Sequence, residues 1–310
     1  MIASICHLIL ALVGAPFLLS VINRTKAWIA GRQGQPWLQP YHDLLRLLRK
    51  GAVYSRTTSW VFRAGPLIGL AAVLTATTLV PFGQARALVA FQGDFIAFVY
   101  LLGLARLVTV LAALDTGSAF EGMGANREVW FSALTEPALM LSLAALAREV
   151  GGNGSLSLSV LHLGMSAAVW SRTGFVLALV AVAWVVVLLS ENSRIPVDDP
   201  TTHLELTMIH EVMVLDHSGP DFAFILYGAA LKLWLFAALF VGLLSPVKTG
   251  LPGVDSVIAL AEVMGVAVGV GLVESVMARL RLPSVPQLLI GACAISSLAF
   301  LIERHGVLLP

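Results

Sequence analysis

The sequence predicts an all-α integral membrane protein, built as one polytopic domain over residues 1–310. Its composition is 58% hydrophobic and 12% charged, with a mean hydropathy of +0.89, whereas ordinary soluble domains carry about 25% charged residues. A chain this apolar has too little polar surface to cover a globule in water. We therefore expect its surface to face lipid, where only helices or closed barrels satisfy their backbone amides. The alternating pattern of a membrane barrel is absent.

Apolar runs of spanning length recur along the chain, and each predicts a transmembrane helix because about 20 residues cross the hydrocarbon core. The eight runs lie near residues 2–22, 64–81, 95–114, 129–148, 173–190, 222–245, 255–276 and 285–302. Pro66 and Pro137 fall near the starts of two runs, where a missing N–H costs least. No tandem repeat or low-complexity linker divides the chain.

The basic residues predict the orientation. The connection at 23–63 holds eight Lys or Arg side chains, and with eight spans it shares a side with residues 115–128, 191–221 and 277–284. The positive-inside rule makes this side cytoplasmic. We expect a multi-pass protein of the cell (inner) membrane, with both termini outside and long cytoplasmic loops.

One part of the first loop has helical periodicity. Residues 37–50, "WLQPYHDLLRLLRK", place four leucines among charged side chains, which predicts a surface amphipathic helix. Such a helix lies either on the membrane surface alone or against a partner protein.

Several classes of function lack their signatures. A net charge of +1 argues against a nucleic-acid partner. Cys6 and Cys293 show no CxxC or metal-ligand spacing, and "HEVMV" has Val214 where HExxH needs its second histidine. No GxSxG or P-loop occurs. We expect no metal, no redox centre and no catalytic residue in this chain.

Acidic side chains are concentrated in one segment, residues 191–221, which reads "ENSRIPVDDPTTHLELTMIHEVMVLDHSGPD". This segment holds seven of the 18 carboxylates and three of the seven histidines. Large apolar residues are interleaved, so we expect packing into the protein rather than a solvated loop. Desolvation and mutual repulsion raise carboxylate pKa values, and histidine titrates near neutral pH without a shift. The candidate proton carriers are Asp198, Asp199, His203, Glu205, His210, Glu211 and Asp216. The three histidines recur every seven residues, near one face if the segment is helical, but too far apart to share a metal ion.

Ionisable groups also occur inside or at the ends of the spans. An ionisable residue inside a membrane span suggests a functional site, and the alternative is that it only pairs with another charge in the protein interior. These groups are Arg106, Glu136, Glu149, Glu191, Lys232, Glu262 and Glu274. The acidic side chains that gather toward the cytoplasmic half favour a polar pathway: Asp115, Glu121, Glu128, Glu136 and Glu191.

Four segments of the chain resemble the motifs of a known family, and they occur in the same order along the sequence. "GRQGQPWLQPYHDLLRLLRK" and "ENSRIPVDDP" resemble the first cytoplasmic loop and the ETNRxPFDLPE motif of the NADH dehydrogenase subunit 1 family of respiratory complex I. "ARLVTVLAALDTGSAFEGMGANREV" and "ESVMARLRL" are similar to the branch that serves formate hydrogenlyase and other energy-converting group 4 [NiFe]-hydrogenases. The resemblance covers nearly the whole chain.

The resemblance implies a membrane anchor that docks a peripheral redox arm and begins a chain of protonatable groups leading to antiporter-like membrane subunits. By position, Arg32, Gly34, Gln39, Asp43 and Arg46 would face the redox arm. The polar pathway would include Glu128, Glu136, Glu191, Arg194, Asp198 and Glu205, and Arg279 would stabilise the last cytoplasmic turn. Iron–sulfur clusters and a [NiFe] centre would belong to hydrogenase-like small and large partner subunits.

The chain departs from the family after Pro200, where the usual Glu-Ala-Glu reads Thr201-Thr202-His203. Two family carboxylates are therefore missing, which weakens the case for a quinone pocket. We expect a non-catalytic anchor that couples an attached redox module to proton or sodium movement. The alternatives are the quinone-site subunit of a respiratory NADH dehydrogenase-type complex and a stand-alone ion carrier.

Overall fold

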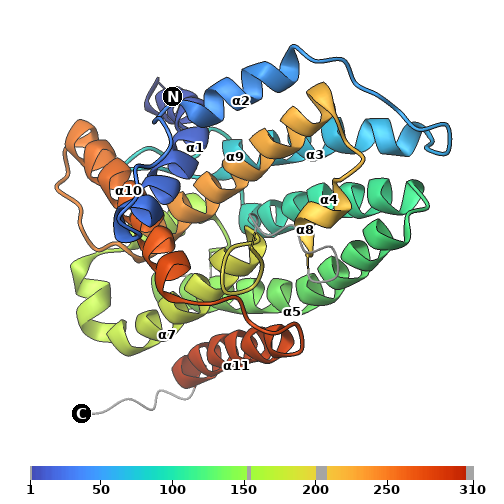
Figure 1. Ribbon diagram of the computed structural model, residues 1–310. Helices are drawn as coiled ribbons and strands as arrows, with labels where there is room; N and C mark the ends of the chain where they lie inside the picture. The colour runs from blue at the N-terminus through green and yellow to red at the C-terminus, as the bar shows by residue number, and fades with distance from the viewer. Residues whose placement is uncertain (1, 152–154, 200–207, 305–310) are drawn as a thin grey trace.

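The computed structural model describes residues 2–151, 155–199 and 208–304, which form eleven helices and no β-strand (Figure 1). The helices are α1 (Ile2–Ile29), α2 (Gln39–Leu48), α3 (Trp60–Leu79), α4 (Asp94–Asp115), α5 (Ala119–Val150), α6 (Leu158–Gly164), α7 (Ala167–Glu191), α8 (His210–Met213), α9 (Gly219–Leu244), α10 (Pro252–Val276) and α11 (Ser284–Arg304). The all-α fold class is thus confirmed.

Within the described part of the chain, eight helices are long and apolar enough to cross a membrane, as predicted. The expected position of two prolines was wrong. Helix α3 begins at Trp60 and α5 at Ala119, so Pro66 and Pro137 lie inside helices. Hydropathy marks only the part of a helix that crosses the hydrocarbon core, and the polar turns that extend beyond it carry no such signal.

Helix α9 lies at the centre of the bundle and packs against α1, α3, α7 and α10. Its Trp234 and Phe236 are fully buried, together with Trp184 of α7. The Trp184 indole N–H donates to Ser142 Oγ at 2.7 Å, so this buried donor is satisfied. The large apolar core fixes α9, and with it the side chain of Lys232.

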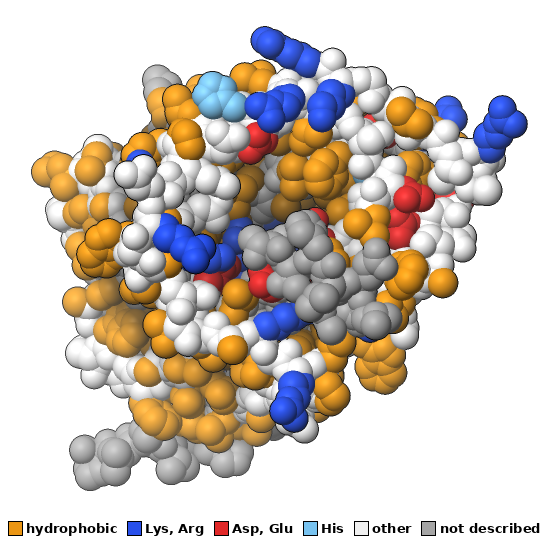
Figure 2. Space-filling view, in the orientation of Figure 1, with side chains coloured by type: hydrophobic (Ala, Val, Ile, Leu, Met, Phe, Trp, Pro, Cys, Tyr) orange, Lys and Arg blue, Asp and Glu red, His pale blue; other side chains and the backbone are white. Residues whose placement is uncertain are grey.

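One end of the bundle carries the long connections, and we call it the loop face. Residues 30–59, 116–118, 192–199, 208–218 and 277–283 lie there. Contacts between them define this end: the Ser59 N–H donates to Asp115 at 2.6 Å, and Arg279 pairs with Asp198 at 2.8 Å. Figure 2 views this face and shows Lys and Arg side chains around it, with Asp and Glu side chains nearer its middle.

The predicted surface helix is α2, which lies across the loop face against α1 and α9. None of its residues is buried. The Tyr41 hydroxyl donates to the Val13 carbonyl, and the Arg24 guanidinium stands 4.5 Å over the Trp37 ring. These contacts hold α2 onto the bundle itself, whatever else covers its outer side.

Candidate functional site

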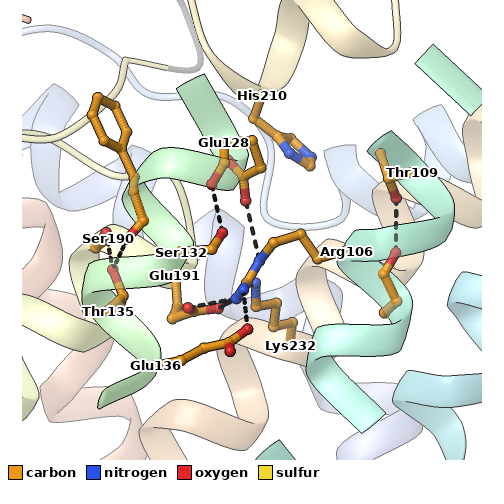
Figure 3. Close-up of polar contacts among 12 residues, drawn as sticks. Arg106, Thr109, Glu128, Ser132, Thr135, Glu136, Ser190, Glu191, His210 and Lys232 are labelled. Atoms are coloured by element: carbon orange, nitrogen blue, oxygen red, sulfur yellow. Dashed lines mark hydrogen bonds and ion pairs between the residues drawn. The ribbon is translucent and has the colours of Figure 1, made fainter. Parts of the chain in front are cut away.

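The centre of the site is Arg106, near the middle of α4 (Figure 3). Its Nη1 lies 2.6 Å from Glu136 of α5, and its Nη2 lies 2.6 Å from both oxygens of Glu191 at the end of α7. Its Nε makes a longer ion pair of 3.4 Å with Glu128 of α5. Lys232 of α9 approaches the second Glu191 oxygen at 2.8 Å. We call these five residues the Arg106 cluster.

The charges of the Arg106 cluster do not balance. Three carboxylates face two cations, so the fully ionised cluster carries a net charge of −1, and the uptake of one proton neutralises it. The Arg106 side chain is 9% exposed and that of Glu191 4%. Burying charges is costly unless they are paired and hydrogen-bonded, and a surplus charge beside a buried pair is costlier still. The cluster is therefore suited to hold and release a proton.

A cavity of about 350 Å³ joins the Arg106 cluster to the loop face. Its polar lining consists of Asn23, Gln35, Asp43, Arg106, Thr109, Glu128, Glu191, Asn192, Ser193, Arg194, Asp198, His210, Glu211 and Lys232 among mostly apolar residues. A second, water-sized space of about 10 Å³ is lined by Glu128, Asp198 and Thr135, among others. Glu128 borders both spaces, so its carboxylate lies between the wide cavity and the smaller space beside the Arg106 cluster.

Asp198 anchors the acidic segment above this cavity. Its carboxylate accepts the N–H groups of Ile209 at 3.3 Å and His210 at 3.1 Å, and it pairs with Arg279. Burial raises the pKa of Asp198, an effect that the His210 N–H and the Arg279 charge oppose. Arg127 of α5 donates to the Met208 carbonyl at 2.8 Å. These contacts place the His210 side chain beside the Arg106 cluster (Figure 3).

A second buried ion group lies on the α1–α10 side. The Glu274 side chain is fully buried, 2.8 Å from Lys26 and 3.3 Å from Arg194. Arg194 thereby ties the segment after α7 to α10, and Arg279 ties the α10–α11 connection to Asp198. Both arginines therefore link separate segments of the chain through ion pairs, and the roles expected of them stay predictions.

The structure separates the predicted pathway residues into groups. Glu128, Glu136 and Glu191 meet at Arg106, while Asp198, His210 and Glu211 line the cavity. The N–H of Asp199 donates to the Asp198 carboxylate. His203 and Glu205 lie outside the described residues.

Three other predicted pathway residues lie away from the Arg106 cluster. Asp115 accepts the N–H groups of Ser59 at 2.6 Å and Phe62 at 3.3 Å, at the start of α3. Glu121 is buried and accepts the N–H of Asp216 at 3.1 Å, and the Asp216 side chain is exposed. The carboxylates of Asp115 and Glu121 thus hold helix ends and connections together.

The residues expected to face a redox arm lie on the loop face, where some pack into the protein and others are exposed. Asp43 lines the cavity and accepts a hydrogen bond of 2.8 Å from Gln39. Arg32 and Arg46 are exposed. Gly34 lies against α1, where a Cβ would come within 3.1 Å of the Ala27 Cβ. Their role in docking stays a prediction.

Arg106 and Lys232 are charged residues within predicted spans, but the sequence pattern assigned neither of them a specific role. Comparing the numbers of acidic and basic residues within the spans would have suggested that they pair with the carboxylates, because buried carboxylates require cations nearby. The seven-residue spacing of the histidines did not indicate a shared helix face. Helix α8 is only four residues long, so His210 lines the cavity while His217 stacks on Phe62, with 4.0 Å between ring centroids.

Comparisons with known proteins agree with this architecture. The model of the family described as NADH dehydrogenase matches residues 2–303. Formate hydrogenlyase subunit 4 of Escherichia coli K12 is 32% identical over 295 residues, 92% of this chain and 93% of that protein. Hydrogenase-4 component C of the same organism is 30% identical over 244 residues, 78% of this chain and 75% of that protein.

A solved structure shares the fold. It is a chain of the membrane-bound sulfane sulfur reductase, an archaeal respiratory membrane complex. The TM-score is 0.82 with 19% identity, and the match covers 97% of this chain and 98% of the other.

Proposed function

The chain belongs to the NADH dehydrogenase family of complex I-like membrane proteins, and from that premise we propose that it is a membrane subunit of a hydrogenase-type or complex I-like complex. Its similarity to formate hydrogenlyase subunit 4 and hydrogenase-4 component C supports the hydrogenase-type assignment. The chain is then an anchor, and the electron transfer takes place in partner subunits that hold the [NiFe] and iron–sulfur centres.

The observation that carries a coupling role is the Arg106 cluster at the inner end of the cavity. Protons enter from the loop face past His210 and Glu128, and the surplus carboxylate of the cluster accepts them. Ionisable groups at mid-membrane are costly in lipid, and they mark ion pathways in many membrane proteins. The loop face, with Asp43 and the basic residues of α2, docks the redox arm on the cytoplasmic side of the cell membrane.

Purification from native membranes in mild detergent tests the subunit assignment. We expect the chain to co-purify with iron–sulfur and hydrogenase-like subunits and with antiporter-like membrane subunits. Reversing the exposed charge by Arg46→Glu should weaken retention of the soluble subunits, whereas Arg172→Glu, outside the loop face, should not. Recovery of the chain alone, still able to move ions, would support a stand-alone carrier instead.

The cavity supports a second candidate, the quinone-site subunit of a respiratory complex. Its volume of about 350 Å³ and largely apolar lining suit a small apolar ligand. Gly69 of α3 lines it, and a Cβ there would make an ordinary 3.5 Å contact with Val108. Gly69→Leu should therefore narrow the cavity. Loss of quinone-dependent turnover in this variant favours the quinone role, whereas a native complex without quinone-dependent turnover favours the hydrogenase-type role.

A further inference from the structure

One member of the Arg106 cluster opens to the outside of the bundle. The Glu136 side chain is 43% exposed, compared with 17% for Glu128 and 4% for Glu191. Glu136 is absent from the lining of both cavities described above, and its α5 neighbours Ala133 and Pro137 are exposed, so we place its exposed part at the outer surface between α4 and α5. Arg106 lies near the middle of α4, and Glu136 contacts it at that depth. A carboxylate is therefore presented toward the hydrocarbon layer.

The surface around Glu136 is open and otherwise apolar. A Cβ on Gly103 of α4 would lie 3.5 Å from Glu136 Oε1 and meet no other atom within 4 Å. Tyr100 and Leu107 share the Gly103 face of α4, three residues before and four after it, and are 70% and 52% exposed. On α5, Ala133 lies one turn from Glu136 and is exposed. We call this surface the α4–α5 flank.

Contact between lipid and the α4–α5 flank is unfavourable because of the Glu136 carboxylate. A charged side chain near the bilayer centre is costly unless it is paired with an opposite charge or hydrated. The Arg106 cluster also carries one negative charge more than its own cations balance. A basic side chain from another helix would satisfy both conditions, because it would shield the exposed Glu136 oxygen and would offset the surplus negative charge whenever the cluster holds no proton.

We propose that the α4–α5 flank is the docking surface for a transmembrane helix of a partner subunit that presents a lysine or arginine to Glu136. This contact would connect the Arg106 cluster laterally to the neighbouring subunit. The inference rests on the proposed function only in requiring that the chain works beside other membrane subunits.

Photo-crosslinking in native membranes tests this surface. Benzoylphenylalanine replaces Tyr100 or Leu107 in the full-length chain, and Val257 of α10, 67% exposed, is the control position. We expect both flank positions to yield an adduct with a transmembrane segment of another subunit, whose crosslinked peptide carries Lys or Arg near its middle. The control position should not yield that adduct. Adducts only with lipid, with a second copy of this chain, with a soluble subunit or with a segment that lacks a basic residue would overturn the proposal.

The charge is tested separately with Glu136→Gln, which removes the negative charge and keeps the size. The adduct yield from Leu107 should fall severalfold in this variant and stay unchanged in Glu262→Gln, a carboxylate of α10 bonded to Ser245. An unchanged yield in Glu136→Gln would contradict the basic partner. Ion movement is not part of this readout, so the flank assignment stands or fails independently of the coupling role.

Discussion

At the scale of single residues, Arg106 is the group on which the site depends. It holds carboxylates that are 30 and 85 positions away in the sequence, and its guanidinium fork reaches both Glu191 oxygens. Only arginine combines a permanent charge with several donors in this geometry. Its role is to keep several acids close together without mutual repulsion.

Removing Arg106 should therefore destabilise the protein strongly. Arg106→Gln leaves Glu191 buried with only Lys232 to balance it, and breaking a buried pair on one side costs about 3–5 kcal/mol. Thermal unfolding in detergent should show a clear drop in Tm. Arg56→Gln, at an exposed position on the loop face, should leave Tm unchanged, and an equal Tm in the two variants would refute the pairing.

His162 of α6 makes a testable contribution at the opposite end of the bundle. It is buried, its Nε2 lies 2.6 Å from the Gly83 carbonyl, and burial lowers its pKa from 6.5 to about 4. Its stabilising effect is complete above pH 6.5 and is lost as pH falls toward 4, because only the unfolded chain binds the proton readily. The shift corresponds to about 3 kcal/mol.

Tm should thus fall between pH 6.5 and pH 4, and His162→Gln should reduce the slope. Lys248, whose pKa burial lowers to about 8, stays protonated throughout this window. His42→Gln on α2 is the control, since His42 is exposed, and it should keep the native slope. The same slope in His162→Gln would show that other groups cause the acid sensitivity.

At the scale of elements, α8 depends on a close approach to α5. Gly124 makes this approach possible, because a Cβ there would lie 2.2 Å from Val212 Cγ1 and 2.8 Å from the Ile209 carbonyl oxygen. Helix α8 has too few residues to be stable by itself. Its position over the cavity comes from this packing and from Asp198.

Gly124→Ala should displace α8 and cost about 1–3 kcal/mol from overpacking. Limited proteolysis of residues 208–218 should become faster, and Tm should fall. The matched control is Gly122→Ala, where the new Cβ would meet only Leu114 at 4.0 Å. That variant should be neutral or more stable, because alanine favours the helix. Equal protection of the segment in both variants would contradict the packing.

The elements were predictable to different degrees. The spanning helices follow from long apolar runs, and α2 from its spacing of leucines. Helices α6 and α8 could not be predicted, since seven or four residues give no usable period and are fixed by tertiary contacts. For the site, the sequence identified the acids but not which of them meet, because hydropathy and spacing carry no information on pairs far apart in the chain.

At the scale of the whole molecule, the orientation stays a prediction from the basic residues. Single cysteines can test it after Cys6 and Cys293 are replaced by alanine. Ser55 lies on the loop face and Val247 on the opposite end, and both are exposed. In intact cells a membrane-impermeant maleimide should label Val247→Cys at once and Ser55→Cys only after permeabilisation. The reverse order would place the loop face outside.

We propose that the Arg106 cluster couples redox chemistry in partner subunits to ion movement through this chain. Glu128 and Glu191 both border the two cavities, and Glu128 is the more informative of the two because it makes only the longest of the Arg106 contacts.

The decisive measurement is the number of ions moved per electron in proteoliposomes that contain the whole complex. Glu128→Gln should keep assembly and electron transfer while ion movement falls roughly 100-fold, as expected when a proton-transfer group is lost. Glu262→Gln should retain the native ratio. A native ratio in Glu128→Gln, with redox turnover intact, would show that ions do not move through the Arg106 cluster.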